Sequence, residues 1–273
     1  MKEAVIELTH HCPNRCIHCS SNYNWGENIR LEEKEVKDII DELGYLGTEE
    51  ICLSGGEPMT YSGLYEVLDY ANKNTDSKLT IYTSGFRGWK GQKPLKEKDF
   101  KKLKELGVEK MAFSVLGVTN NYNLGEGEFA KLPHSLHSFL SSYDSHLQFV
   151  EKKEFVPHGK DNYEEFLPSL KKTVEKSSKE GLETSMSFTV IKPNVYDMKP
   201  SVKYFEDSGT DEFSFLRYVP QSCHEDWVKK IMKENKSYDK LQPNKKEMNY
   251  VEKKLIDLYK GYKNKKMKVR LGD

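Results

Sequence analysis

The chain has 273 residues, of which 36% are hydrophobic and 32% charged, and its 43 basic residues balance 43 acidic residues. This length suits one large α/β barrel or two small domains. Balanced charge argues against a basic surface for nucleic acid. No apolar stretch reaches the ~18 residues of a membrane span, and no signal-peptide pattern follows Met1. We therefore expect a cytoplasmic protein that does not enter a membrane and does not have nucleic acid as its partner.

Short β-like runs alternate with amphipathic helical segments along the chain. Repeated strand–helix alternation predicts parallel strands joined by right-handed crossovers. Six such units are visible, fewer than a complete (β/α)8 barrel contains. The sequence therefore predicts an α/β fold, a partial (β/α)6 TIM-like barrel. The predicted strands cover residues 4–8, 50–53, 78–83, 110–116, 184–191 and 212–219, and the main helices 32–46, 64–71, 100–106, 163–181 and 202–205.

Two regions depart from the simple alternation. Residues from about 119 to 160 hold a predicted helix (129–140) and a predicted strand (147–156), which we interpret as an insertion on the barrel. Residues 221–273 are predicted to form a C-terminal helical extension. The predicted barrel domain therefore covers residues 1–220.

The chemistry-bearing feature of the sequence is a group of three cysteines, Cys12, Cys16 and Cys19, directly after the first strand. Clustered cysteines in a chain without secretion signals indicate metal or redox chemistry rather than disulfides. Three soft thiolates suit an iron–sulfur cluster or zinc. Zinc would require a fourth ligand, which His11 or His18 could supply. On a four-iron cluster the same three cysteines would leave one iron open.

A second motif follows the second strand, where Gly55 and Gly56 precede Glu57 and Pro58. The ends of the first and second strands lie on the same face of a barrel, the face where chemistry occurs. Adjacent glycines permit backbone conformations closed to other residues and let a ligand approach closely. Glu57 offers a carboxylate to a cationic group.

The spacing of the cysteines followed by the Gly55–Pro58 motif resembles the radical S-adenosylmethionine superfamily. The resemblance implies that Cys12, Cys16 and Cys19 are the metal ligands and catalytic residues, which hold a [4Fe–4S] cluster. It implies that S-adenosylmethionine binds the open iron, and that Gly55, Gly56 and Glu57 hold its amino group while Pro58 shapes the turn.

The resemblance also implies an activity. The cluster would cleave S-adenosylmethionine reductively to a 5′-deoxyadenosyl radical, which abstracts hydrogen from a substrate, with a flavodoxin- or ferredoxin-type protein as the electron donor. Further contacts with S-adenosylmethionine are expected from residues at the ends of later strands and from one residue of the cysteine loop. These residues are His18, Thr83, Ser84, Ser114 and Leu216.

Two segments, residues 215–221 and 269–273, look like those of peptide- and protein-modifying (SPASM-type) members of that superfamily. Such members carry a C-terminal cysteine-rich domain with further clusters. Only Cys52 and Cys223 remain here, too few for a second four-iron cluster. The expected substrate is a peptide or protein side chain. The alternatives are a nucleotide or other small molecule, or a zinc or iron–sulfur binding module that is not an enzyme.

Overall fold

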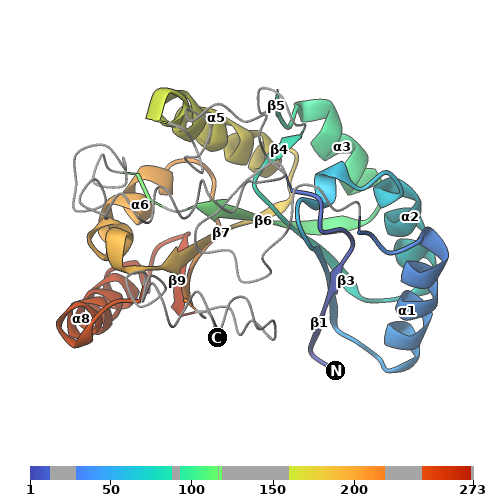
Figure 1. The fold of residues 1–273 in the computed structure, drawn as a ribbon, viewed down its shortest axis with the longest axis horizontal. Helices are drawn as coiled ribbons and strands as arrows, with labels where there is room; N and C mark the ends of the chain where they lie inside the picture. The colour runs from blue at the N-terminus through green and yellow to red at the C-terminus, as the bar shows by residue number, and fades with distance from the viewer. Residues whose placement is uncertain (13–28, 88–92, 116, 119–159, 219–241, 272–273) are drawn as a thin grey trace, which may run out of the picture.

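The computed structural model describes residues 1–12, 29–87, 93–115, 117–118, 160–218 and 242–271 (Figure 1). Cys16, Cys19, His18 and Cys223 lie outside these residues. So do most of the predicted insertion and residues 221–241 of the predicted helical extension.

One parallel sheet organises the described part of the chain. Each strand pairs with the strand before it, and the first and last strands, β1 and β9, do not pair with each other. A sequential order without a switch point gives a curved, open barrel rather than a doubly wound sheet. The strands, in sheet order, are β1 (Glu3–Glu7), β2 (Glu50–Ser54), β3 (Lys78–Thr83), β6 (Val108–Val115), β7 (Glu183–Val190), β8 (Glu212–Arg217) and β9 (Lys268–Leu271).

The helices connect successive strands and cover the outer side of the curved sheet (Figure 1). A short 3-10 helix, η1 (Pro58–Thr60), follows β2, and η3 (Lys192–Asp197) follows β7. A two-stranded hairpin, β4 (Phe86–Arg87) and β5 (Lys93–Pro94), follows β3. The helices are α1 (Glu33–Tyr45), α2 (Leu64–Asn74), α3 (Glu97–Glu105), α5 (Lys160–Lys179), α6 (Met198–Phe205) and α8 (Lys245–Tyr262).

Local signals in the sequence set several helix starts. The side chain of Glu35 accepts a hydrogen bond from the backbone N–H of Glu32 at 2.7 Å, which caps α1. At α8, the side chain of Asn244 accepts bonds from the N–H groups of Lys246 (2.9 Å) and Glu247 (3.1 Å). Such caps satisfy backbone donors that have no partner inside the helix.

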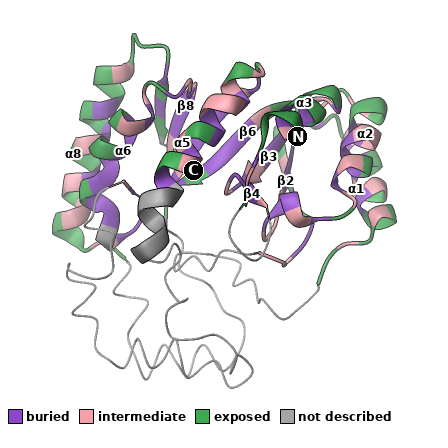
Figure 2. Ribbon diagram, turned by 90° about the horizontal axis from the view of Figure 1, so that it is seen from above, coloured by how far each residue is buried: buried purple, intermediate pink, exposed green. Residues whose placement is uncertain are grey.

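The main apolar core lies between the helices and the outer face of the sheet. Alternate residues of each strand, such as Ile51 and Leu53 on β2, are fully buried there with the apolar stripes of the helices. In Figure 2, the buried surfaces of the helices face the sheet and their exposed surfaces face outward. A period of two in the strands and 3.6 in the helices directs both sets of side chains into this layer.

The opposite, inner face of the sheet is polar and carries an ionic network of Lys78, Lys110, Glu183, Glu212 and Arg270. The Lys78 ammonium lies 2.5 Å from the Glu183 carboxylate, and Arg270 Nε lies 2.8 Å from the Glu212 carboxylate. Lys110 contacts both glutamates, at 3.5 and 3.8 Å. The network joins five strands, from β3 to β9, toward the end of the sheet at which the strands begin.

The predicted α/β fold and partial barrel are confirmed. The structure adds a seventh strand, because Lys268–Leu271, which lies inside the predicted helical extension, pairs with β8. It also adds the β4–β5 hairpin, whose two-residue strands are too short to give an alternating pattern. Within the described residues, no helix has the length and apolar character required to cross a membrane.

We predict that Glu183→Gln lowers stability at neutral pH by about 1 kcal/mol, since 39% of this side chain is exposed and solvent screens its ion pairs. Burial alone would raise its pKa, but Lys78 and Lys110 lower the pKa of the Glu183 carboxyl below the ordinary 4.5. The folded state therefore binds fewer protons than the unfolded state, and this contribution is lost as the pH falls below that value.

Urea unfolding of the wild type and the variant between pH 3 and 8 measures this difference. The two curves should converge at acid pH. The control is Glu97→Gln, which removes an exposed pair with Lys101 on α3 and should change stability by less than about 0.5 kcal/mol. A constant gap across the pH range would contradict the prediction.

Candidate active site

The two ends of the cysteine loop are held together where β1 ends. The backbone N–H of His10 donates to the carbonyl of Ile29 at 2.8 Å, and the N–H of Leu31 donates to the carbonyl of Leu8 at 3.0 Å. The Thr9 hydroxyl donates to Ile29 at 3.3 Å and accepts from the His11 N–H at 3.0 Å. The segment that begins at Cys12 therefore leaves and returns at one fixed point on the rim of the barrel.

The glycine loop after β2 contacts this point through its main chain. The Gly56 N–H donates to the Thr9 carbonyl at 2.5 Å, and the Glu57 N–H donates to the His11 carbonyl at 2.8 Å. A Cβ on Gly56 would lie 2.2 Å from the His11 oxygen. Gly55 has a φ of +123°, and its Cβ would lie 2.6 Å from the Thr9 oxygen. Only glycine fits at both positions.

The Glu57 side chain is 99% buried and accepts four hydrogen bonds. Its Oε1 accepts from the Thr83 hydroxyl at 2.6 Å and from the Met59 N–H at 3.2 Å. Its Oε2 accepts from the Ser84 hydroxyl at 2.6 Å and the Ser84 N–H at 2.8 Å. Burial raises the pKa of the Glu57 carboxyl above its ordinary value, and the four donors oppose that effect. This geometry favours a supporting role for the Glu57 carboxylate over direct contact with a cationic ligand.

The predicted contact residues Thr83 and Ser84 thus meet Glu57, while Pro58 begins η1 and is buried. Ser114 and Leu216 lie on the inner face near the ends of β6 and β8, with Ser114 exposed and Leu216 half-buried. No hydrogen bond between described residues joins these two side chains to the glycine loop. Their roles as cofactor contacts stay predictions.

Of the three predicted cysteine ligands, Cys12 is the one that lies within the described residues. Cys12 is half-buried at the start of the loop. Within the described residues, no three His, Cys, Asp or Glu side chains are grouped to hold a metal ion. Cys52 is fully buried, and its thiol donates to the Glu3 carboxylate at 3.3 Å on the inner face of the sheet. Burial raises the pKa of the Cys52 thiol well above its ordinary value, so it is not a reactive thiolate.

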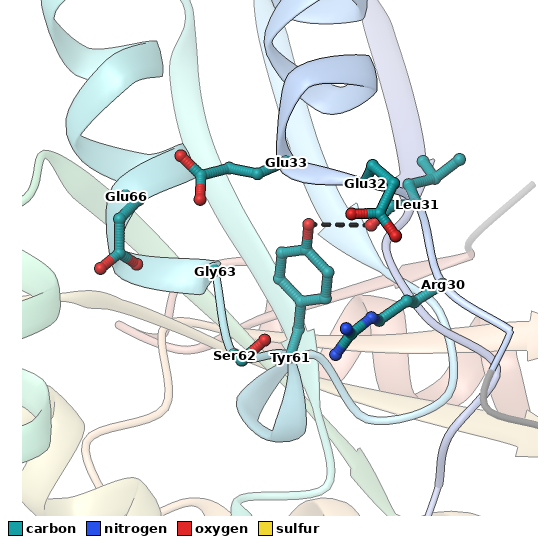
Figure 3. Close-up of a pocket in the computed structure, with 8 residues that line it drawn as sticks. All are labelled: Arg30, Leu31, Glu32, Glu33, Tyr61, Ser62, Gly63 and Glu66. Carbon is teal, nitrogen blue, oxygen red and sulfur yellow. Dashed lines mark hydrogen bonds between the residues drawn. The ribbon is translucent and has the colours of Figure 1, made fainter.

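A cavity of about 210 Å³ lies beside the start of α1 and the turn into α2 (Figure 3). The Tyr61 hydroxyl donates to the Leu31 carbonyl across it at 3.0 Å. Arg30 and three glutamates (Glu32, Glu33 and Glu66) also line it. None of the predicted site residues is among its lining residues, so we place the candidate site at the rim between β1, β2 and β3 rather than in this cavity.

Sequence reasoning missed two residues that organise the rim. Thr9 uses its hydroxyl and its carbonyl to join β1 to both the loop return and Gly56. Asp197 is 98% buried in η3 and accepts from the Val118 N–H at 3.1 Å, which ties the end of β7 to the segment after β6. The available signals were a threonine directly after a strand and an aspartate just before a helix, and both patterns are common.

The fold and site together define an open α/β barrel with a candidate site, shaped by two glycines, at the carboxyl ends of its first three strands. The model of the Radical SAM superfamily matches residues 6–199. The chain therefore belongs to the radical S-adenosylmethionine superfamily, whose members are enzymes.

Two curated relatives illustrate the similarity. The mycofactocin maturase MftC of Mycolicibacterium smegmatis is 38% identical over 65 residues, which make up 24% of this chain and 17% of MftC. The Fe-coproporphyrin III synthase of Methanosarcina barkeri is 31% identical over 142 residues, or 49% of this chain and 33% of that protein. The matches thus cover a minor part of each relative.

Among solved structures, SuiB of Streptococcus suis bound to its precursor peptide SuiA superposes with a TM-score of 0.60 and 15% identity. The match covers 99% of this chain and 48% of the SuiB chain. SuiB has also been solved bound to S-adenosylmethionine, again with a TM-score of 0.60. At this identity the likeness shows the fold, and this chain spans about half the length of SuiB.

We predict that Gly56→Ala destabilises the protein by about 1–3 kcal/mol, because the new methyl group must displace the backbone of His10 and His11. The matched control is Gly261→Ala in α8, where an added Cβ meets no atom within 4 Å. That variant should be neutral or more stable by up to about 1 kcal/mol, from the higher helix propensity of alanine. Urea unfolding of both variants checks this, and equal stabilities would contradict it.

Proposed function

We propose that this chain is the catalytic barrel of an enzyme that cleaves S-adenosylmethionine reductively at a [4Fe–4S] cluster held by Cys12, Cys16 and Cys19. The observation that carries the proposal is the pair of backbone hydrogen bonds from Gly56 and Glu57 to the residues directly before Cys12. These bonds place Gly55 and Gly56, which have no side chains, against the residues that precede the cysteine loop.

The residue types at the site fit a [4Fe–4S] cluster with S-adenosylmethionine beside it. Three thiolates are soft ligands suited to iron–sulfur clusters. Gly55 and Gly56 carry no Cβ where they approach Thr9 and His11, which lets the loop after β2 pack directly against the residues that precede Cys12. When bound, the cluster and S-adenosylmethionine supply the radical that abstracts hydrogen, and the protein supplies position and exclusion of water.

A binding module without activity is the weaker interpretation. A structural zinc site is closed by four protein ligands and needs no neighbouring loop. Here the β2 loop is shaped by two glycines and held by four bonds to a buried carboxylate. That construction supports a site for a second ligand beside the cysteines.

The proposed substrate is a peptide or protein side chain. It is supported by the likeness of nearly the whole chain to SuiB, which was solved with a precursor peptide. The second candidate is a small molecule, and the similarity to a coproporphyrin enzyme over 142 residues favours it. We further propose a cytoplasmic location and a flavodoxin- or ferredoxin-type electron donor, since the cluster requires one-electron reduction.

Anaerobic reconstitution with iron and sulfide tests the cofactor. We expect a brown protein with about four irons per chain, as a [4Fe–4S] cluster requires. The variant Cys12→Ala/Cys16→Ala/Cys19→Ala should lose this iron. The control Cys52→Ala/Cys223→Ala, which changes the two other cysteines, should retain it. A colourless protein with one tightly bound zinc would contradict the proposal.

The substrate class is tested by 5′-deoxyadenosine production from S-adenosylmethionine in the reconstituted, dithionite-reduced protein. We expect a mixed pool of short peptides to raise 5′-deoxyadenosine production above the level measured without substrate. The peptide that reacts should change mass. A pool of nucleotides and a pool of porphyrins serve as the comparison. A response to either of these, with none to peptides, would assign the enzyme to small molecules. Replacing dithionite with flavodoxin or ferredoxin tests the donor.

A further inference from the structure

We infer that Glu57, Thr83 and Ser84 form a clamp that holds the start of the cysteine loop, so that Glu57 is a positioning residue for the metal centre. The inference depends on the proposed function only for the identity of the metal centre. The clamp itself is a property of the polypeptide.

The clamp joins three neighbouring strand ends. The Glu57 carboxylate, which follows β2, accepts the Thr83 and Ser84 hydroxyls at 2.6 Å each and so connects to the end of β3. The Glu57 N–H donates to the His11 carbonyl at 2.8 Å and so connects to the end of β1. One residue thus links β3 to the residue directly before Cys12.

The hydroxyl of Thr83 makes two hydrogen bonds within the clamp. It accepts from the Gly85 N–H at 3.0 Å and donates its proton to Glu57. Thr83 is also 97% buried. Because the only proton of this hydroxyl is already donated inside the protein, Thr83 acts through Glu57 and not as a donor to a bound cofactor.

The Glu57 carboxyl group depends on these donors, because hydrogen bonds are the polar contacts that the described residues make with it. No lysine, arginine or histidine among the described residues forms an ion pair with Glu57. A buried charge without a counter-ion is tolerated only when hydrogen bonds replace its hydration. Loss of one donor therefore weakens the position of the carboxylate, and the N–H of the same residue moves with it.

The chain offers a matched pair of variants on one strand. Thr83→Val removes a buried hydroxyl that donates to Glu57 at the rim. Thr80→Val removes a fully buried hydroxyl that donates to Glu50 at 2.5 Å, three residues before Thr83 and on the opposite face of β3. Both changes are threonine to valine on β3. Thr80→Val removes the bond to Glu50, while Thr83→Val removes the bond to Glu57 and the bond from the Gly85 N–H.

The experiment is amide hydrogen exchange in the protein without metal, followed by mass spectrometry at Gly56 and Glu57. We expect exchange at these amides to accelerate about tenfold in Thr83→Val, the size of effect that follows the loss of one bond to a buried charge. Ser84→Ala should act in the same direction, and Thr80→Val should leave the two amides at the wild-type rate once exchange is corrected for global stability. Equal acceleration in Thr83→Val and Thr80→Val would overturn the clamp.

Whether the clamp positions the metal centre is tested by the rate of iron release. In the reconstituted protein, iron release to a chelator should be faster in Thr83→Val than in Thr80→Val by a similar factor. If the two variants release iron equally while their amide exchange differs, the clamp does not position the metal centre, and the inference is wrong on that point. If the wild type binds no iron, the proposed function fails, and amide exchange still decides whether the clamp exists.

Discussion

The close approach of the glycine loop to the end of β1 is the constraint on which the rim of this barrel depends. Two N–H···O=C bonds, from Gly56 to Thr9 and from Glu57 to His11, require that no side chain stand between the two loops. Every other feature of the site follows from this contact. The return of the cysteine loop is fixed relative to it, and the Glu57 carboxylate extends it to β3.

The two faces of the sheet have different chemistry because the barrel is open. Helices cover the outer face, so alternate strand residues are apolar and fully buried there. The inner face is only partly enclosed, and charged residues there keep some contact with water while pairing with one another. An ionic network with partial exposure avoids the full cost of burying charge. The pairs join strands that are not all adjacent, as Lys78 on β3 reaches Glu183 on β7.

The fold was largely accessible from the sequence because its helices are amphipathic and its strands are short apolar runs. The six predicted strand–helix units all appear with small shifts at their ends. The strand β9 was not predicted as part of the sheet, since Lys268–Leu271 has only four residues and directly follows a lysine-rich segment. Its place in the sheet is set by pairing with β8, which is a long-range interaction.

The site was accessible as a list of residues but not as a set of contacts. Spacing identified the cysteines and the glycines, because these residue types have few other uses in such patterns. It could not show that the Glu57 carboxylate faces Thr83 and Ser84, 26 and 27 residues away along the chain. The part played by Thr9 depends on its carbonyl oxygen, an atom that every residue has, and no sequence pattern distinguishes it.

The strictly sequential order of the sheet has a consequence for biosynthesis. Within the seven-stranded sheet, each strand after β1 pairs on one side with a strand that the ribosome has already made, and none must wait for a later strand to fill a gap between earlier ones. The sheet can therefore grow by one edge as the chain emerges, with each helix covering the strands just formed. The first elements completed in this order are β1, β2 and β3, and these are the strands whose ends carry the clamp and the glycine loop.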